Sequence, residues 1–314
     1  MTSKIVEGVL RVPPNCLHLE KLSSLTILQG TLVCQTAVHI GTGDQVIPGG
    51  ADMPVLKDAA GRPFIPGSSL KGVLRSFAER LVVSLVPVGE KVDYNTFDAK
   101  FTSCLLHTES HFCLSTCRAL QQEFTSLREK NKLKTDSAIT AWIKKRTCSV
   151  CRFFGSPYLA GRVWVKDAFV VGEPQPLEVR AGVAIDRDRR AAAAKLLYDL
   201  EAVPPCTGFS LEIRVENADK AELGLLFIVL EQLNKGEVHL GGRGSAGLGR
   251  VDFRRESILY LASGRDDGAA FRQKYLDHLL GKKVGVLDTA EAAAFFEDCK
   301  SSFAQRIRKG WGDV

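Results

Sequence analysis

The sequence lacks the long apolar run that a membrane-spanning helix requires. Its longest uncharged apolar stretch, Leu223 to Leu230, is far shorter than the ~20 residues that cross a bilayer. Glu7 and Arg11 lie where a signal peptide would be apolar. These absences predict a cytoplasmic protein without a membrane partner.

Low-complexity tracts and short-period repeats are also missing, which excludes solenoids and coiled coils. The 314 residues are 45% hydrophobic and 25% charged, as in folded globular domains rather than disordered tails. At ~150 residues a domain, the length suits about two domains, or one domain with large insertions.

Charge of one sign is only modestly in excess, with 42 Lys and Arg against 36 Asp and Glu and a net charge of +6. This excess suits a polyanionic partner and favours nucleic acid over a membrane. The nine cysteines are an odd number in a chain without a secretory signal. They argue against a disulfide framework and favour metal ligation or simple burial.

Several familiar catalytic motifs are absent, because the sequence has no H-E-x-x-H or Walker motif and no Ser-His-Asp order. Gly242, Gly244 and Gly247 satisfy G-x-G-x-x-G. A helix is expected before them and a strand after them, however, which excludes a dinucleotide-binding fold. This glycine-rich loop, residues 241–249, could instead present N–H groups, Arg243 and Ser245 to phosphates, or form a flexible hairpin connection.

The order of expected elements predicts an α+β protein of ferredoxin-like topology. Ser68 and Ser69 lie where a helix N-cap is expected, and Asp219 with Glu222 resembles a capping box. Expected strands cover 25–40, 163–171, 179–185, 209–215, 237–240 and 248–253, with helices after residue 69 and at 223–233. The expected organisation is an N-terminal extension (1–24), a main domain (25–254) with insertions at 86–160 and 186–206, and a mainly helical C-terminal extension (255–314).

A metal site is expected in the first insertion. Cys148 and Cys151 form a C-x-x-C pair, and a second group of cysteines and histidines precedes it by some thirty residues: Cys104, His107, His111, Cys113 and Cys117. Two such clusters can close a tetrahedral zinc site. Cys113 and Cys117, on adjacent turns if helical, are the expected partners, with Cys104 and His111 as alternatives. Buried free thiols or a redox pair are the other interpretation.

Phosphate contacts and catalysis have weaker signals. Lys71 and Arg75 lie one turn apart near an expected helix N-terminus. They could form a phosphate-binding site or simply belong to a solvated helix face. Asp44, Asp52 and Asp58 occupy the loop before this helix. They could bind a divalent ion or accept a proton, or could simply form turns.

The combination of motifs is more specific than any one of them. It comprises His39-Ile40-Gly41, Asp52 to Asp58, Pro66 to Gly72 with Arg75, Ala184 to Arg187, and Gly241 to Gly249. Together these motifs resemble the RAMP superfamily, and within it a backbone subunit of a type III CRISPR interference complex. The resemblance covers about residues 28–253, and Cys148 to Gly155 fits the zinc-bearing variants.

The resemblance implies an RRM-like palm, a thumb hairpin from about Val179 to Phe209, and a structural zinc held by Cys113, Cys117, Cys148 and Cys151. It implies that copies of the chain and other effector subunits assemble on a guide RNA, and that Asp52 supports cleavage of complementary target RNA with Mg²⁺ or another divalent ion. The implied RNA-binding residues are His39, Lys57, Ser68, Ser69, Lys71, Arg75, Arg187, Gly242, Arg243, Gly244 and Ser245.

Two alternatives stay open. The first is a subunit that binds and shapes RNA without cleaving it. The second is an endonuclease that processes repeat RNA; such enzymes usually use a histidine base, and the lone His39 argues against it.

Overall fold

The computed structural model describes residues 21–42, 51–86, 101–105, 113–130, 132–186, 191–263 and 268–310. The chain divides into a smaller unit (1–23, 79–162 and 305–314) and a larger unit (24–78 and 163–304). Helices α1 (Gly67–Leu85) and α7 (Thr289–Gly310) each begin in the larger unit and end in the smaller one. Within the described residues, no helix is long and apolar enough to cross a membrane.

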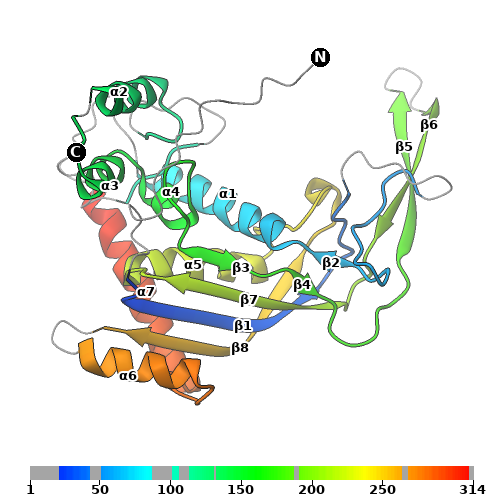
Figure 1. Ribbon diagram of the computed structural model, residues 1–314. Helices are drawn as coiled ribbons and strands as arrows, with labels where there is room; N and C mark the ends of the chain where they lie inside the picture. Colours follow the sequence, from blue (N-terminus) through cyan, green and yellow to red (C-terminus); the bar gives the residue numbers. More distant parts are fainter. Residues whose placement is uncertain are drawn as a thin grey trace. The chain divides into compact units, whose positions relative to one another are not determined.

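The larger unit contains a four-stranded antiparallel sheet in the order β3-β7-β1-β8 (Figure 1). The strands are β1 (Ser24–Cys34), β3 (Val163–Val165), β7 (Gly208–Glu216) and β8 (Val251–Ala262). Helix α1 lies between β1 and β3 in sequence, and α5 (Lys220–Asn234) lies between β7 and β8. This order and pairing are those of the ferredoxin-like βαββαβ arrangement, so the predicted fold class is confirmed.

The core of this unit follows from the apolar pattern of its elements. Leu25, Leu28 and Leu32 of β1 are fully buried. Helix α5 begins with the predicted capping box, in which the Asp219 side chain accepts from the Glu222 N–H (2.9 Å) and Glu222 accepts from the Asp219 N–H (3.1 Å). The helix is buried nearly all round because it also packs on α7, where Phe227 stacks on Phe296 with ring centroids 3.8 Å apart.

Several predicted strand boundaries were wrong. The first strand ends at Cys34 rather than residue 40, because the next two residues hydrogen-bond to the Arg250 carbonyl instead of continuing the ladder. Residues 163–171 divide into β3 and β4 (Ala168–Phe169), and β4 pairs with β2 (Phe64–Ile65). Residues 237–240 form only one bridge, His239 to Arg250, between two glycines of positive φ, Gly236 and Gly241.

Two longer segments remain, of which the first agrees with the prediction and the second differs from it. Strands β5 (Glu178–Asp186) and β6 (Ala191–Ala202) form an antiparallel hairpin, which is the thumb hairpin that the resemblance implied from about Val179 to Phe209. Strand β8 continues to Ala262 because its second half stays paired with β1, so residues 255–262 are not helical. The C-terminal helices follow as α6 (Gly268–Leu279) and α7.

The smaller unit is mainly helical in its described residues. It contains α2 (Arg118–Glu129), α3 (Asp136–Lys145) and α4 (Ser149–Phe154). Helices α2 and α3 share an apolar core that includes Leu120, Phe124, Ile139 and Ile143. Phe124 also stacks on Trp142 at 5.2 Å.

Candidate functional site

The loop that carries Asp52 is fixed to the base of the β5–β6 hairpin. Met53 pairs in parallel with Leu200, its N–H donates to the Asp199 carbonyl (3.0 Å), and its carbonyl accepts from the Glu201 N–H (3.0 Å). These bonds add the segment to the side of β6 that does not pair with β5. The loop is therefore ordered at Asp52 by backbone pairing, and not only by the proline that follows Met53.

Asp52 itself is exposed and anchored. Its Oδ2 accepts a hydrogen bond from the Asp199 N–H at 2.9 Å. One oxygen of the carboxylate is thus oriented by a backbone donor while the group stays accessible to a ligand. Of its neighbours, Asp58 caps its own turn by accepting from the Ala60 and Arg62 N–H groups (both 2.9 Å), and Asp44 lies outside the described residues.

Glu201, which sequence reasoning missed, joins the parts of the site. Its carboxylate accepts from the Val55 N–H (3.0 Å) and pairs with Lys57 Nζ at 2.9 Å. Its backbone carbonyl lies 2.7 Å from Nδ1 of His39. Burial raises the pKa of Glu201, but the hydrogen bonds from Lys57 and Val55 and the charges of Lys57 and His39 outweigh it, so the pKa is lowered. Glu201 is therefore an anion at neutral pH.

The glycine-rich loop approaches the same hairpin base. The Gly242 N–H donates to the His39 carbonyl (3.0 Å), and a Cβ at Gly241 would lie 2.0 Å from that oxygen, so only glycine fits there. Arg243 has a left-handed backbone (φ 62°), and its guanidinium lies 4.6 Å from the centre of the Tyr198 ring. Its Nη2 is 3.7 Å from the Met53 sulfur.

Seven predicted site residues thus lie in the loops around the hairpin base, the last two of them in the short 3₁₀ turn Gly244–Ala246: His39, Asp52, Lys57, Gly242, Arg243, Gly244 and Ser245. The side chains of this surface offer one anchored carboxylate, that of Asp52, and one exposed cation, that of Arg243. Arg187 lies outside the described residues.

The α1 residues occupy a separate element. Ser68 and Ser69 do not cap the helix as predicted, because α1 already begins at Gly67, whose N–H donates to the Asp167 carboxylate (2.7 Å). Both serines lie exposed in the first turn. Lys71 and Arg75 are half-buried, and burial together with the Arg75 charge lowers the pKa of Lys71.

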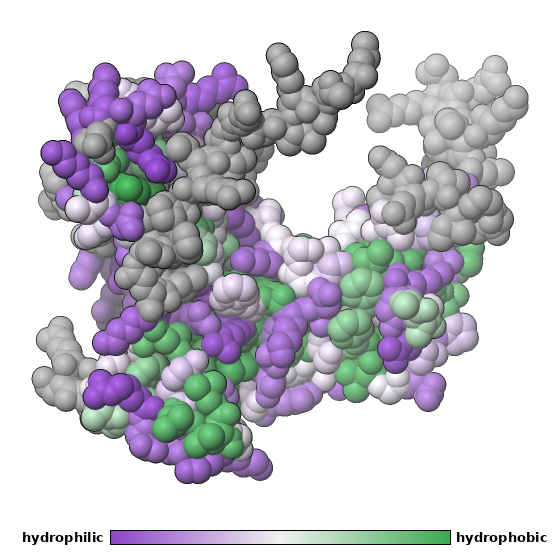
Figure 2. Space-filling view, in the orientation of Figure 1, coloured by the Kyte–Doolittle hydropathy of each residue, from purple (hydrophilic) through white to green (hydrophobic). Residues whose placement is uncertain are grey.

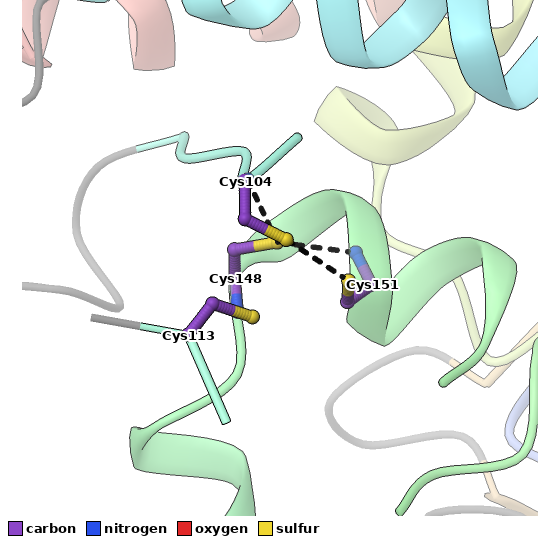
Figure 3. Close-up of side chains that lie close together, drawn as sticks. All are labelled: Cys104, Cys113, Cys148 and Cys151. Atoms are coloured by element: carbon purple, nitrogen blue, oxygen red, sulfur yellow. Dashed lines mark hydrogen bonds between the residues drawn. The ribbon is translucent and has the colours of Figure 1, made fainter. Parts of the chain in front are cut away.

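A four-cysteine cluster lies in the smaller unit (Figure 3). The sulfurs of Cys104, Cys113, Cys148 and Cys151 are buried and lie within 4.8 Å of one another. The Cys104 sulfur is 3.5 Å from that of Cys151 and 3.7 Å from that of Cys148. Four thiolates at ~2.3 Å from a tetrahedral zinc would be separated by about 3.8 Å, so the donor set fits that metal.

The surroundings of the cluster suit a thiolate site. The Cys104 and Cys151 N–H groups donate to the Cys148 sulfur, and the Cys148 N–H donates to the Cys113 sulfur, each at 3.4 Å. Burial raises the pKa of Cys148 well above its ordinary value, while hydrogen bonds from the Cys104, Cys148 and Cys151 side chains lower that of Cys113. A buried set of this kind could hold a metal such as zinc.

The fourth cysteine of the cluster is Cys104, whereas Cys117 was the expected ligand and Cys104 the alternative. Cys113 lies before a turn and not in a helix, so Cys117, one turn later, directs its side chain into the apolar core with Leu114, Leu120 and Phe124. The other three predicted cysteines are in the cluster. Residues His107 and His111 lie outside the described part of the chain.

Comparisons with known proteins agree with this architecture. The family model of the RAMP superfamily matches residues 31–252. The chain is 27% identical to the CRISPR system Cms endoribonuclease Csm3 of Methanocaldococcus jannaschii, over 74% of this chain and 80% of that protein. It is 28% identical to the protein of the same name from Methanothermobacter thermautotrophicus, over 74% and 84%. The chain therefore belongs to the RAMP superfamily.

Proposed function

We propose that the chain is a guide-RNA-binding backbone subunit of a type III CRISPR effector complex and that it cleaves complementary target RNA in antiviral defence. The observation that carries this proposal is the anchored, exposed carboxylate of Asp52 at the base of the β5–β6 hairpin, beside the glycine-rich loop. The similarity to two endoribonucleases of CRISPR systems supports it. The assembly would contain further copies of the chain, other effector subunits and both RNAs.

The site suits RNA binding without sequence readout. Gly242 and Ser245 lie in an exposed loop, and Arg243 adds a cation next to them. Backbone N–H groups and cations bind phosphates whatever the base, so a guide of any sequence can be held while base pairing selects the target. Lys71 and Arg75 on α1 would add two phosphate contacts, as the resemblance implies.

Asp52 would act on the target strand opposite the hairpin. A hairpin that unstacks one nucleotide could align its 2′-OH for in-line attack on the adjacent phosphate. Asp52 could accept the hydroxyl proton or hold a divalent ion, because an exposed carboxylate oxygen is the ligand type that Mg²⁺ prefers. Such an ion would supply charge stabilisation at the scissile phosphate.

The remaining residues have supporting roles. Glu201 positions the Asp52 segment, and His39 is tied to the Glu201 carbonyl through Nδ1. This contact makes His39 a structural link between hairpin and loop and weighs against repeat-RNA processing with a histidine base. A structural zinc on Cys104, Cys113, Cys148 and Cys151 would hold the smaller unit together.

The purified complex tests this proposal on an RNA complementary to its guide. We expect cleavage that stops when a chelator removes the divalent ion. An RNA that is not complementary to the guide serves as the control and should stay intact. Asp52→Ala should abolish cleavage but keep assembly and target binding. A complex that binds the target tightly without cutting it under any divalent ion would show instead a non-catalytic, RNA-shaping subunit.

A further inference from the structure

The positive charge of the chain is concentrated in the smaller unit rather than at the proposed guide site. Residues 113–162 contain ten Lys and Arg but three Asp and Glu, a net charge of +7, against +6 for the whole chain. The rest of the sequence therefore sums to −1. A polyanion would meet its strongest attraction on α2, α3 and their surroundings.

Several cations of the larger unit have an anionic partner. Lys57 pairs with Glu201, Lys166 with Glu212, and Lys300 with Glu231, all at 2.7–2.9 Å. The connection between α2 and α3 differs. Lys130, Lys132 and Lys134 are exposed and form no ion pair with any described residue. With Arg128 they make what we call the basic turn.

Helix stabilisation explains only part of the basic turn. Arg128 and Lys130 lie at the C-terminal end of α2, where the helix dipole favours cations. Lys134 has the opposite location, directly before Thr135, whose side chain caps α3 by accepting from the Ala138 N–H (3.2 Å). Cations are disfavoured at that end of a helix. Nη1 of Arg128 is also buried without a hydrogen-bond partner in the described structure.

The surface around the basic turn suits a phosphate backbone better than a protein. The large apolar side chains of α2 and α3, such as Phe124 and Ile143, are buried in their own core. Among the described residues of 113–162, no large hydrophobic side chain is strongly exposed, and Figure 2 shows a mainly hydrophilic surface over these helices. Protein interfaces depend on buried apolar and aromatic anchors, whereas nucleic-acid binding rests on counterion release by cations.

We propose that the basic turn binds the phosphodiester backbone of a single-stranded nucleic acid, independently of sequence. This inference goes beyond the proposed function, because it places a second contact outside the hairpin base and the glycine-rich loop. The cations of the basic turn would add phosphate contacts to an RNA strand without changing the sequence with which that strand pairs.

The test is the salt dependence of oligonucleotide binding by the full chain. The variant K130Q/K132Q/K134Q is compared with R272Q/K274Q/K283Q, which removes three exposed cations in and after α6. Single-stranded RNA and DNA of one sequence serve as probes. We expect the slope of log K against log salt to fall by about 2 in the first variant, at roughly 0.7 for each contact, and to stay unchanged in the second. The charge-preserving K130R/K132R/K134R should keep the wild-type slope.

Equal dependence for RNA and DNA would support a pure phosphate contact, and a larger effect for RNA would support one aided by the 2′-OH. An unchanged slope in the Gln variant, or an equal fall in both triple variants, would overturn the proposal. So would binding of poly-glutamate that depends on these lysines while oligonucleotide binding does not. Cleavage dependent on Asp52 should persist in the Gln variant, so the two proposals fail separately.

Discussion

Removing the Glu201 carboxylate should release the Asp52 segment from the hairpin. In Glu201→Ala, the Val55 N–H and the Lys57 ammonium both lose their partner. The Glu201 side chain is only 16% exposed, so the hydrogen bond to a charged acceptor counts for about 1.5–3 kcal/mol and the ion pair for up to ~1 kcal/mol. A loss of about 2 kcal/mol increases opening of the segment roughly thirty-fold, since 1.4 kcal/mol is a factor of ten.

Amide hydrogen exchange of residues 51–57 measures this opening, with Glu178→Ala as the matched control. Glu178 lies on β5 of the same hairpin, and among the described residues its carboxylate pairs only with its exposed neighbour Arg180, so its loss should change little. Glu201→Gln keeps an acceptor for Val55 and should fall between wild type and Ala. Cleavage should decline in the same order while guide binding holds. Wild-type protection in Glu201→Ala would refute the reasoning.

The pH dependence of this contact has a definite sign. The pKa of Glu201 is lowered from its ordinary value of 4.5, so its ionised form is favoured in the folded protein. Its contribution is therefore complete above that value and is lost as pH falls through the lowered pKa. Protection of residues 51–57 should be constant from pH 7 to 5 and decline only in more acidic buffer.

Two further predictions concern the metal centre and α1. Cys104→Ser should reduce bound zinc from about one ion per chain and make the smaller unit more sensitive to protease. Cys117→Ser should keep the metal, because the Cys117 sulfur lies outside the cluster. Equal metal content in both variants would contradict the assignment of Cys104 as a ligand. Lys71→Ala combined with Arg75→Ala should lower the salt slope of RNA binding by about 0.7 per lost phosphate contact, and an unchanged slope would mean that these cations do not touch RNA.

The sequence predicts the fold where local signals agree with the final packing. Alternation along β1 and β7 and the capping box at Asp219 sufficed for the ferredoxin-like order. The residue pattern alone did not indicate strand β6, which only the resemblance implied, because its four alanines, 191–194, have low β-propensity and its pairing with β5 is set by the hairpin. Strand β8 was underestimated because its charged middle, Arg254 to Glu256, interrupts the apolar pattern.

For the site, the sequence indicated candidate residues but not how they lie relative to one another. Asp52, His39 and Arg243 were identified individually, but their convergence depends on Met53 pairing with β6, which no spacing encodes. Glu201 had one usable signal, a carboxylate between the apolar residues Leu200 and Ala202 at the end of a strand. The identity of the fourth cysteine in the cluster depends on whether Cys113 begins a helix or a turn, and tertiary contacts decide between these two conformations.

The charge of Asp52 is the central claim, and Asp52→Asn tests it most directly. Asn can still accept the Asp199 N–H through its amide oxygen, so this variant removes the charge but keeps the anchor. Asp58→Asn is the matched control, because it preserves the acceptor in the turn of the same loop. In a cleavage time course on complementary RNA with divalent ion, the account predicts a rate lower by a factor on the order of a hundred or more for Asp52→Asn, with target binding unchanged, and near wild-type cleavage for Asp58→Asn. Full cleavage by Asp52→Asn would contradict the account.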